Sequence, residues 1–191
     1  MKIKPYLLIA CVLLLLTSCD NTPVPEDAIT SETGYTDVTS VKLAIDTAAP
    51  DFDLQSLNGD WVALSELRGA KILMIFYRGH WCPFCVGHLQ DIQTTLPELE
   101  QRGYQVLAIS PDDATDMQKM ADRMDRPYQF LSDAGLKVTD LYGIRRDEEL
   151  PHPAMILLDG QGLVKWFYIG EDYKTRPSAT QLQRVLDRLD S

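Results

Sequence analysis

The chain has 191 residues, of which 45% are hydrophobic and 24% charged, a composition typical of a globular protein rather than a disordered one. That length allows one ordinary domain with additional segments. The formal net charge of -10 excludes nucleic acid as a partner bound through its phosphates, because such binding requires a basic surface.

The first 18 residues have the pattern of an export signal. Two early lysines precede an almost wholly apolar run over 6–16, which is short for a membrane span, since a spanning helix needs about 20 apolar residues. The run ends in Leu16-Thr17-Ser18-Cys19, which resembles the lipobox of bacterial lipoproteins, whose cysteine is acylated and becomes the new N-terminus. We therefore expect residues 1–18 to be a signal peptide and Cys19 to carry lipid, with a short retained membrane anchor as the alternative.

This leader predicts a lipid-anchored protein of the bacterial cell envelope that faces the periplasm or the outside. Asp20 resembles the signal that retains enterobacterial-type lipoproteins at the inner membrane, which applies if the host is Gram-negative. Residues 19–47 are rich in Thr, Ser, Pro, Asp and Glu and show little apolar periodicity. We expect them to form a flexible tether that lifts the domain off the membrane by roughly 25–30 Å.

From residue 48 onward the pattern predicts alternating strands and helices. Apolar residues at 52–54 and 61–64 flank Asn58-Gly59, which is typical of a β-hairpin, and a helical turn is expected at 65–68. The run over 71–77 is continuously apolar, as in a buried central strand. A helix is expected from about Pro83 to Gln101, kinked or split at Pro97.

The second half continues the alternation. Strands are expected at 104–109, 128–131, 154–158 and 163–168, and helices at 110–124, 134–142 and 178–189. Ser178 with Gln181 three residues later predicts a capping box for the last helix. The pattern predicts an α/β fold over 48–191, with a mixed central sheet and helices on both faces.

Two cysteines follow the strand at 71–77. Of the four cysteines, Cys11 lies in the leader and Cys19 is the expected lipidation site, so Cys82 and Cys85 remain in the folded part. Their C-x-x-C spacing lets the sulfurs bond to each other without backbone movement. At a helix start, free N–H groups and the helix dipole favour a reactive thiolate. The motif therefore predicts catalytic thiol–disulfide chemistry at Cys82 and Cys85.

Residues 48–190 resemble the peroxiredoxin-like (AhpC/TSA, redoxin) family of the thioredoxin superfamily, with a thioredoxin-type C-x-x-C motif. The resemblance is carried by Ala49-Pro50-Asp51-Phe52, Leu64-Ser65-Glu66-Leu67-Arg68-Gly69, Phe76-Tyr77-Arg78-Gly79, Pro151-His152-Pro153-Ala154, Asp159-Gly160, Asp172-Tyr173 and Arg176-Pro177. It implies a thioredoxin fold with a peroxiredoxin-like N-terminal hairpin. It also implies an antioxidant thiol oxidoreductase that needs no cofactor.

The motif departs from the peroxiredoxin pattern at two positions. In that family a Pro, three residues, a Thr or Ser and two further residues precede the peroxidatic cysteine. Cys85 stands at the peroxidatic position, Cys82 at the Thr position and Arg78 at the Pro position. Cys82 also matches the thioredoxin nucleophile. The resemblance thus implies thiol–disulfide exchange, which we favour, or thiol-dependent reduction of hydroperoxides as the alternative.

Four further residues are candidates for substrate binding. By the same resemblance, Pro153 matches the cis-proline that faces the motif in thioredoxin folds, and His152 precedes it. Trp81 is a candidate wall of the site or a packing residue, and Arg78 a thiolate-stabilising cation or a structurally paired one. We expect protein or small-molecule disulfides or hydroperoxides as substrates, and a thioredoxin-type thiol as electron donor.

A copper chaperone of the Sco type is the alternative from another class, with Cys82, Cys85 and His152 as copper(I) ligands. Its C-x-x-x-C motif is one residue longer than the spacing here. Zinc at Cys82, Cys85 and His88 lacks a clear fourth ligand, so no metal is expected. His80 and His88 are expected at the surface or in packing, and the acidic and basic residues near the C-terminus on a solvated face.

Overall fold

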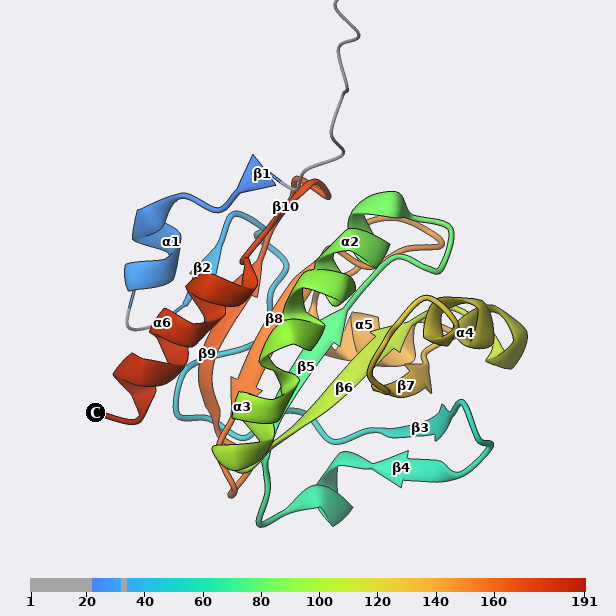
Figure 1. The fold of residues 1–191 in the computed structure, drawn as a ribbon, viewed down its shortest axis with the longest axis horizontal. Coiled ribbons are helices and arrows are strands. Elements are labelled where there is room, and N and C mark those ends of the chain that lie inside the picture. The colour runs from blue at the N-terminus through green and yellow to red at the C-terminus, as the bar shows by residue number, and fades with distance from the viewer. Residues whose placement is uncertain (1–21, 32–33) are drawn as a thin grey trace, which may run out of the picture.

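A mixed eight-stranded sheet forms the centre of the computed structural model, which describes residues 22–31 and 34–191 (Figure 1). The predicted signal peptide, Cys19 and Asp20 lie outside the described residues and stay predictions. Within the described ranges, no helix is both long and apolar enough to cross a membrane.

The elements alternate as the sequence predicts. The strands are β1 (Thr22–Pro23), β2 (Tyr35–Thr36), β3 (Asp53–Ser56), β4 (Trp61–Ala63), β5 (Lys71–Phe76), β6 (Tyr104–Ser110), β7 (Gln129–Ser132), β8 (Ala154–Leu158), β9 (Val164–Ile169) and β10 (Thr175–Arg176). The helices are α1 (Glu26–Thr30), α2 (Pro83–Ile92), α3 (Leu96–Gln101), α4 (Ala114–Ala121), α5 (Lys137–Tyr142) and α6 (Ala179–Leu189), with 3-10 turns η1 (Leu64–Leu67) and η2 (Gln93–Thr95).

The large sheet has the order β2-β9-β8-β5-β6-β7-β3-β4. β5 pairs parallel with β6 and antiparallel with β8, and residues 72–76 are buried because helices or the β3–β4 hairpin cover both faces. Leu73 and Ile75 face the layer of α2, α4 and α6, while Met74 and Phe76 face α5 and the hairpin. This arrangement confirms the predicted α/β thioredoxin fold.

Local sequence signals set the helix boundaries. Pro83 occupies the first turn of α2, and the expected long helix divides at η2 before Pro97, which lies in the first turn of α3. Ser178 and Gln181 form the predicted capping box of α6. α4 begins at Ala114, later than expected, because the Asp113 carboxylate caps it by accepting from the Asp116 N–H.

Residues 22–31 and 34–36, here called the N-terminal arm, lie on the domain, so the predicted flexible tether over 19–47 is wrong for these residues. β1 pairs parallel with β10, and β2 pairs parallel with β9 at the edge of the large sheet. Val24, Ala28 and Ile29 are buried in the same cluster as α6. The polar composition of the arm favours a disordered segment. The burial of these three apolar side chains nevertheless offsets the conformational entropy lost when the arm is ordered.

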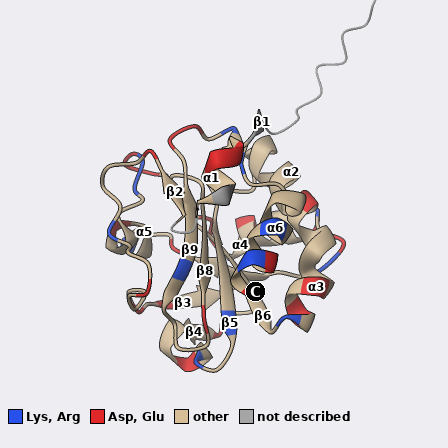
Figure 2. Ribbon diagram, turned by 90° about the vertical axis from the view of Figure 1, so that its left-hand side faces the viewer, with Lys and Arg blue, Asp and Glu red and all other residues tan. Residues whose placement is uncertain are grey.

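Charged residues cover the outer helices. Figure 2 shows acidic and basic positions side by side on α3 and α6. Arg102 donates to Glu98, Asp187 and Asp190, and Arg184 contacts Glu26. The solvated face predicted for the C-terminal charges is thus present on α6, with one exception at Arg176.

Candidate active site

The C-x-x-C motif lies where β5 passes into α2. Cys82 is the N-cap of α2, and the Cys85 N–H points at its Sγ from 3.4 Å. The preceding turn is closed by the Cys82 N–H, which donates to the Gly79 carbonyl. A Cβ on Gly79 would lie 2.6 Å from Trp81 Nε1 and 2.8 Å from Asp112 Oδ1, so this turn requires glycine.

Both sulfurs are buried. Cys82 is 1% exposed and Cys85 0%. The two thiols are free, and their Sγ atoms are 2.6 Å apart, beyond the roughly 2.05 Å of an S–S bond. A disulfide between them therefore needs only a small side-chain movement.

The surroundings divide the two thiols electrostatically. The pKa of Cys82 is lowered to about 6, against the effect of burial. The causes are hydrogen bonds donated by the Cys85 thiol and by the Cys85 N–H, together with the positive charges of Arg176 and Arg78. Burial and the neighbouring Cys82 raise the pKa of Cys85, although Arg176 acts in the opposite direction. At neutral pH the structure places the negative charge of the pair on Cys82.

Arg176 is a site residue that the sequence analysis missed. Its Nη2 lies 3.3 Å from Cys85 Sγ, and the residue is only 3% exposed, so its assignment to a solvated face is wrong. β10 carries it under the start of α6, 91 positions along the chain from Cys85. Its Nη1 is buried and, among the described residues, has no hydrogen-bond partner. The Arg-Pro sequence before the cap of the last helix was the available signal.

The mouth of the site is aromatic and cationic. Trp81 is 51% exposed, and the Arg78 guanidinium lies 4.9 Å from its ring centroid. The same guanidinium lies 4.5 Å from the ring centroid of Tyr173. Tyr173 in turn meets Phe84, the residue between the cysteines, edge to face at 5.6 Å. Trp81 therefore lies at the rim rather than in the core, and Tyr173 is a second residue that the sequence did not single out.

His152 and Pro153 enter β8 beside the motif without the expected geometry. Ala154 pairs with Phe76, so both residues lie at the edge of the sheet where the motif loop begins. The described chain has no cis peptide bond, so the expected cis form of Pro153 is wrong. The His152 N–H donates to the Ile144 carbonyl at 2.8 Å, which keeps the segment extended, and trans is the lower-energy isomer. That N–H is consequently not free to bind a substrate.

His80 fixes the loop before the cysteines. Its N–H donates to Asp112 Oδ2 at 2.8 Å, and its carbonyl accepts from Arg123 Nη1 at 2.7 Å. Its Nδ1 lies 3.5 Å from Asp112 Oδ1 and 3.7 Å from Asp116 Oδ1. Both peptide groups of His80 are thus held by residues outside the loop, so His80 is a packing residue of the site.

The proposed metal ligands are not brought together. In the part of the chain that the structure describes, the one cluster of three potential ligands is His80, Asp112 and Asp116. The copper set of Cys82, Cys85 and His152 does not converge, so the copper-chaperone alternative has no support. His88 is buried, and its Nε2 lies 3.0 Å from the Pro177 carbonyl, which excludes it as a zinc ligand in this arrangement.

Comparison with known proteins places this geometry among thiol enzymes. The model of the AhpC/TSA family matches residues 45–167. A putative chloroplastic peroxiredoxin Q of Oryza sativa subsp. indica is 30% identical over 154 residues, covering 79% of this chain and 71% of that protein. The thiol-disulfide oxidoreductase ResA of Halalkalibacterium halodurans is 28% identical over 123 residues, covering 64% and 66%.

Solved structures agree on the fold. The reduced 2-Cys peroxiredoxin of Plasmodium vivax superposes with a TM-score of 0.69 at 18% identity, over 76% of this chain and 96% of that one. A putative thiol:disulfide interchange protein DsbE of Chlorobium tepidum gives a TM-score of 0.63 at 24% identity, over 78% and 99%.

Proposed function

The chain belongs to the AhpC/TSA family and is a thiol-based oxidoreductase, and from that premise we propose that it exchanges disulfides, with Cys82 attacking and Cys85 resolving. The Cys82 thiolate attacks one sulfur of the substrate disulfide. The substrate S–S bond breaks, one thiolate leaves and takes a proton from solvent, and a mixed disulfide forms on Cys82.

Cys85 completes the reaction. After losing its proton, its sulfur attacks Cys82 Sγ, and the second substrate thiol leaves as a thiolate. The products are a Cys82–Cys85 disulfide and a substrate reduced by two electrons. A thioredoxin-type dithiol is the proposed donor that returns these electrons.

The hydrogen bonds that Cys82 Sγ accepts from the Cys85 N–H and thiol at the start of α2 carry this assignment, and they lower the pKa of Cys82 to about 6. The lowered pKa makes Cys82 the group that is charged at neutral pH, whereas Cys85 stays protonated beside it. Arg78 supports the thiolate electrostatically, and we propose that Trp81 contacts the substrate at the rim.

Trapping of mixed disulfides tests the assignment. A Cys85→Ser variant is expected to accumulate mixed disulfides, because nothing displaces the substrate from Cys82. The matched Cys82→Ser variant should trap little, since the remaining thiol has a raised pKa. Mass spectrometry after incubation with hydroxyethyl disulfide measures both. Trapping confined to Cys82→Ser would reverse the two roles.

The contact between Arg176 and Cys85 favours peroxide reduction as a second candidate function, with an antioxidant role. In this reaction a Cys85 thiolate attacks one peroxide oxygen, the O–O bond breaks, and the protonated leaving oxygen departs as alcohol or water. The resulting sulfenic acid is attacked by Cys82, which releases water and forms the disulfide. The hydroxyl donor of peroxiredoxins is absent at Cys82, and loss of one such donor typically costs ~10²–10³ in rate.

Stopped-flow oxidation by hydrogen peroxide and by a disulfide ranks the two candidates. We expect measurable peroxide reduction that is slower than disulfide exchange. A second-order constant for peroxide of ~10⁷ M⁻¹s⁻¹ or above would make peroxide reduction the main activity.

We further propose that acylated Cys19 anchors the protein in the bacterial envelope, which rests on the lipobox-like sequence alone. Labelling with a radioactive fatty acid should mark the wild type and not Cys19→Ala. Normal processing of that variant by ordinary signal peptidase would contradict the proposal.

A further inference from the structure

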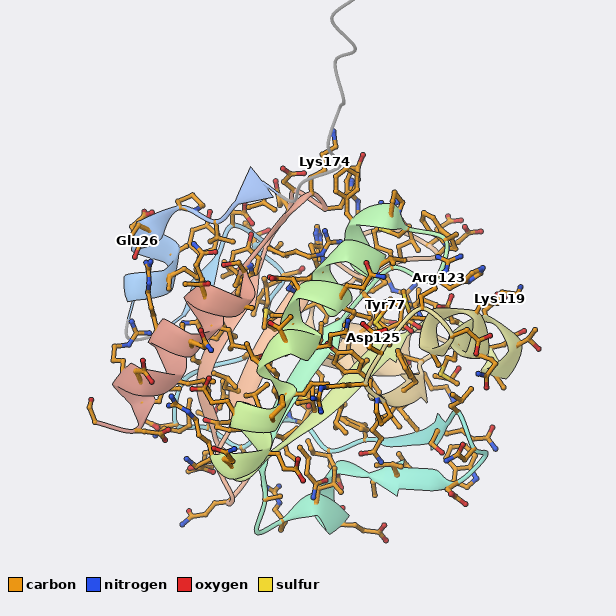
Figure 3. All side chains as sticks on the ribbon, in the orientation of Figure 1. Glu26, Tyr77, Lys119, Arg123, Asp125 and Lys174 are labelled. Atoms are coloured by element: carbon orange, nitrogen blue, oxygen red, sulfur yellow. The ribbon has the colours of Figure 1, made fainter. Side chains whose placement is uncertain are left out.

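Three cations surround one aromatic ring at the mouth of the site. The Arg78 guanidinium lies 4.5 Å, the Arg146 guanidinium 5.3 Å and Lys174 Nζ 5.6 Å from the ring centroid of Tyr173. Figure 3 shows Lys174 at the end of the molecule where α2 begins. The cations come from three separate loops, so their convergence is a product of the fold.

The three cations are not held in ion pairs, although the Asp172 carboxylate lies close enough to Lys174 for the lysine to lower the pKa of Asp172. None of the three cations takes part in an ion pair with any described residue. The Asp172 carboxylate accepts from the Lys174 N–H and the Thr175 hydroxyl, and so closes its own turn.

Building on the proposed disulfide exchange, we propose that Arg78, Arg146 and Lys174 bind the carboxylate of a small acidic disulfide substrate. The cations lie around Tyr173, whose ring meets Phe84 of the motif, so an anion held there lies beside the C-x-x-C motif. A carboxylate suits the planar fork of arginine, which binds it through two parallel hydrogen bonds. Because both sulfurs are at most 1% exposed, a small substrate fits the entrance better than a folded protein surface.

Charge-matched disulfides test the proposal. The reduced protein is mixed with dithiodipropionate, hydroxyethyl disulfide or cystamine, which are anionic, neutral and cationic, and oxidation is followed by tryptophan fluorescence. Each rate is corrected for the intrinsic reactivity of the disulfide with free dithiothreitol. At low salt we expect the anionic disulfide to react about tenfold faster than the neutral one, with the preference falling as salt rises.

Arg146→Gln/Lys174→Gln is the diagnostic variant, because these two cations lie outside the motif itself. It should lose most of the anion preference and keep the rate with the neutral disulfide, which also reports correct folding. Lys119→Gln/Lys137→Gln is the matched control: it removes the same charge at exposed positions on α4 and α5, and Lys119 lies far from Lys174 in Figure 3. The control should keep the wild-type preference.

Three outcomes would overturn the proposal, and a fourth would overturn the proposed function as well. If the diagnostic variant keeps the wild-type ratio, or if wild type shows no salt-dependent preference, the cluster does not select substrate, and the proposed function stands. A preference that appears only with disulfides of acidic proteins would assign the cluster to a protein partner instead. If the neutral disulfide is not reduced by the wild type, the proposed function itself fails.

Discussion

Removing the buried guanidinium beside the dithiol should weaken the thiolate. In Arg176→Gln, a neutral amide replaces the cation whose Nη2 lies 3.3 Å from Cys85 Sγ and which lowers the pKa of both cysteines. A hydrogen bond to a charged group contributes about 1.5–3 kcal/mol, and one pKa unit corresponds to about 1.4 kcal/mol. Because the charge of the pair is on Cys82, which Arg176 reaches through space and not through a hydrogen bond, the first ionisation should rise from about 6 by less than the roughly one to two units that loss of a direct hydrogen bond to the thiolate would give.

Thiolate absorbance at 240 nm, titrated with pH on the reduced protein, measures this ionisation. The value belongs to the pair, because the sulfurs are close enough to titrate together. Arg184→Gln, at an exposed arginine of α6, is the charge-matched control and should titrate as wild type. A first ionisation of Arg176→Gln that stays at the wild-type pH would refute the reasoning, because the contact would then have no electrostatic consequence.

Three further predictions follow from neighbouring contacts. Asp112→Ala leaves the partly buried His80 N–H without its acceptor and should lower the free energy of unfolding by about 1–3 kcal/mol in urea titrations, while Asp112→Asn, which keeps an acceptor, should retain most of the stability. Gly79→Ala should destabilise the motif loop and slow disulfide exchange, since its Cβ would approach Trp81 Nε1 to 2.6 Å; wild-type rates would contradict this. Burial and Arg176 lower the pKa of His88 to about 3. Between about pH 6.5 and pH 3 the unfolded chain therefore binds one proton more than the folded protein. The free energy of unfolding should fall as the pH drops through this range, by about 1.4 kcal/mol per pH unit. Unfolding at several pH values should show this slope in wild type and lose it in His88→Gln.

The fold was predictable because its strands carry strong local signals. The apolar run that became β5, the Asn58-Gly59 turn and the capping box at Ser178 each depend on residues close together in the sequence. The C-x-x-C motif belongs to this class too, since strand, loop and helix start are contiguous. Its position at the N-cap of α2 follows from Pro83 in the next position.

The residues that were missed depend on distant contacts. Arg176 is buried because β10 pairs with β1 and carries it to a cysteine 91 positions away, and apart from the Pro that follows it no local pattern distinguishes it from the exposed Arg184 of α6. Tyr173 meets Arg78 and Arg146, which come from two other loops, as well as its chain neighbour Lys174. The N-terminal arm has few apolar residues, so its sequence predicts a tether. The domain nevertheless supplies an apolar face that buries the few it has.

If Cys19 carries lipid, as proposed, the pairing of β1 with β10 determines which end of the domain lies near the membrane. β1 begins at Thr22, only three positions after Cys19, and three residues span at most about 11 Å. With lipid on Cys19, as proposed, no long flexible linker separates the domain from its lipid anchor. The end that carries β1, β10 and Arg176 is instead kept close to the bilayer. Such an attachment keeps the active site in a thin layer at the membrane surface. The effective concentration of substrates confined to the same layer is thereby raised.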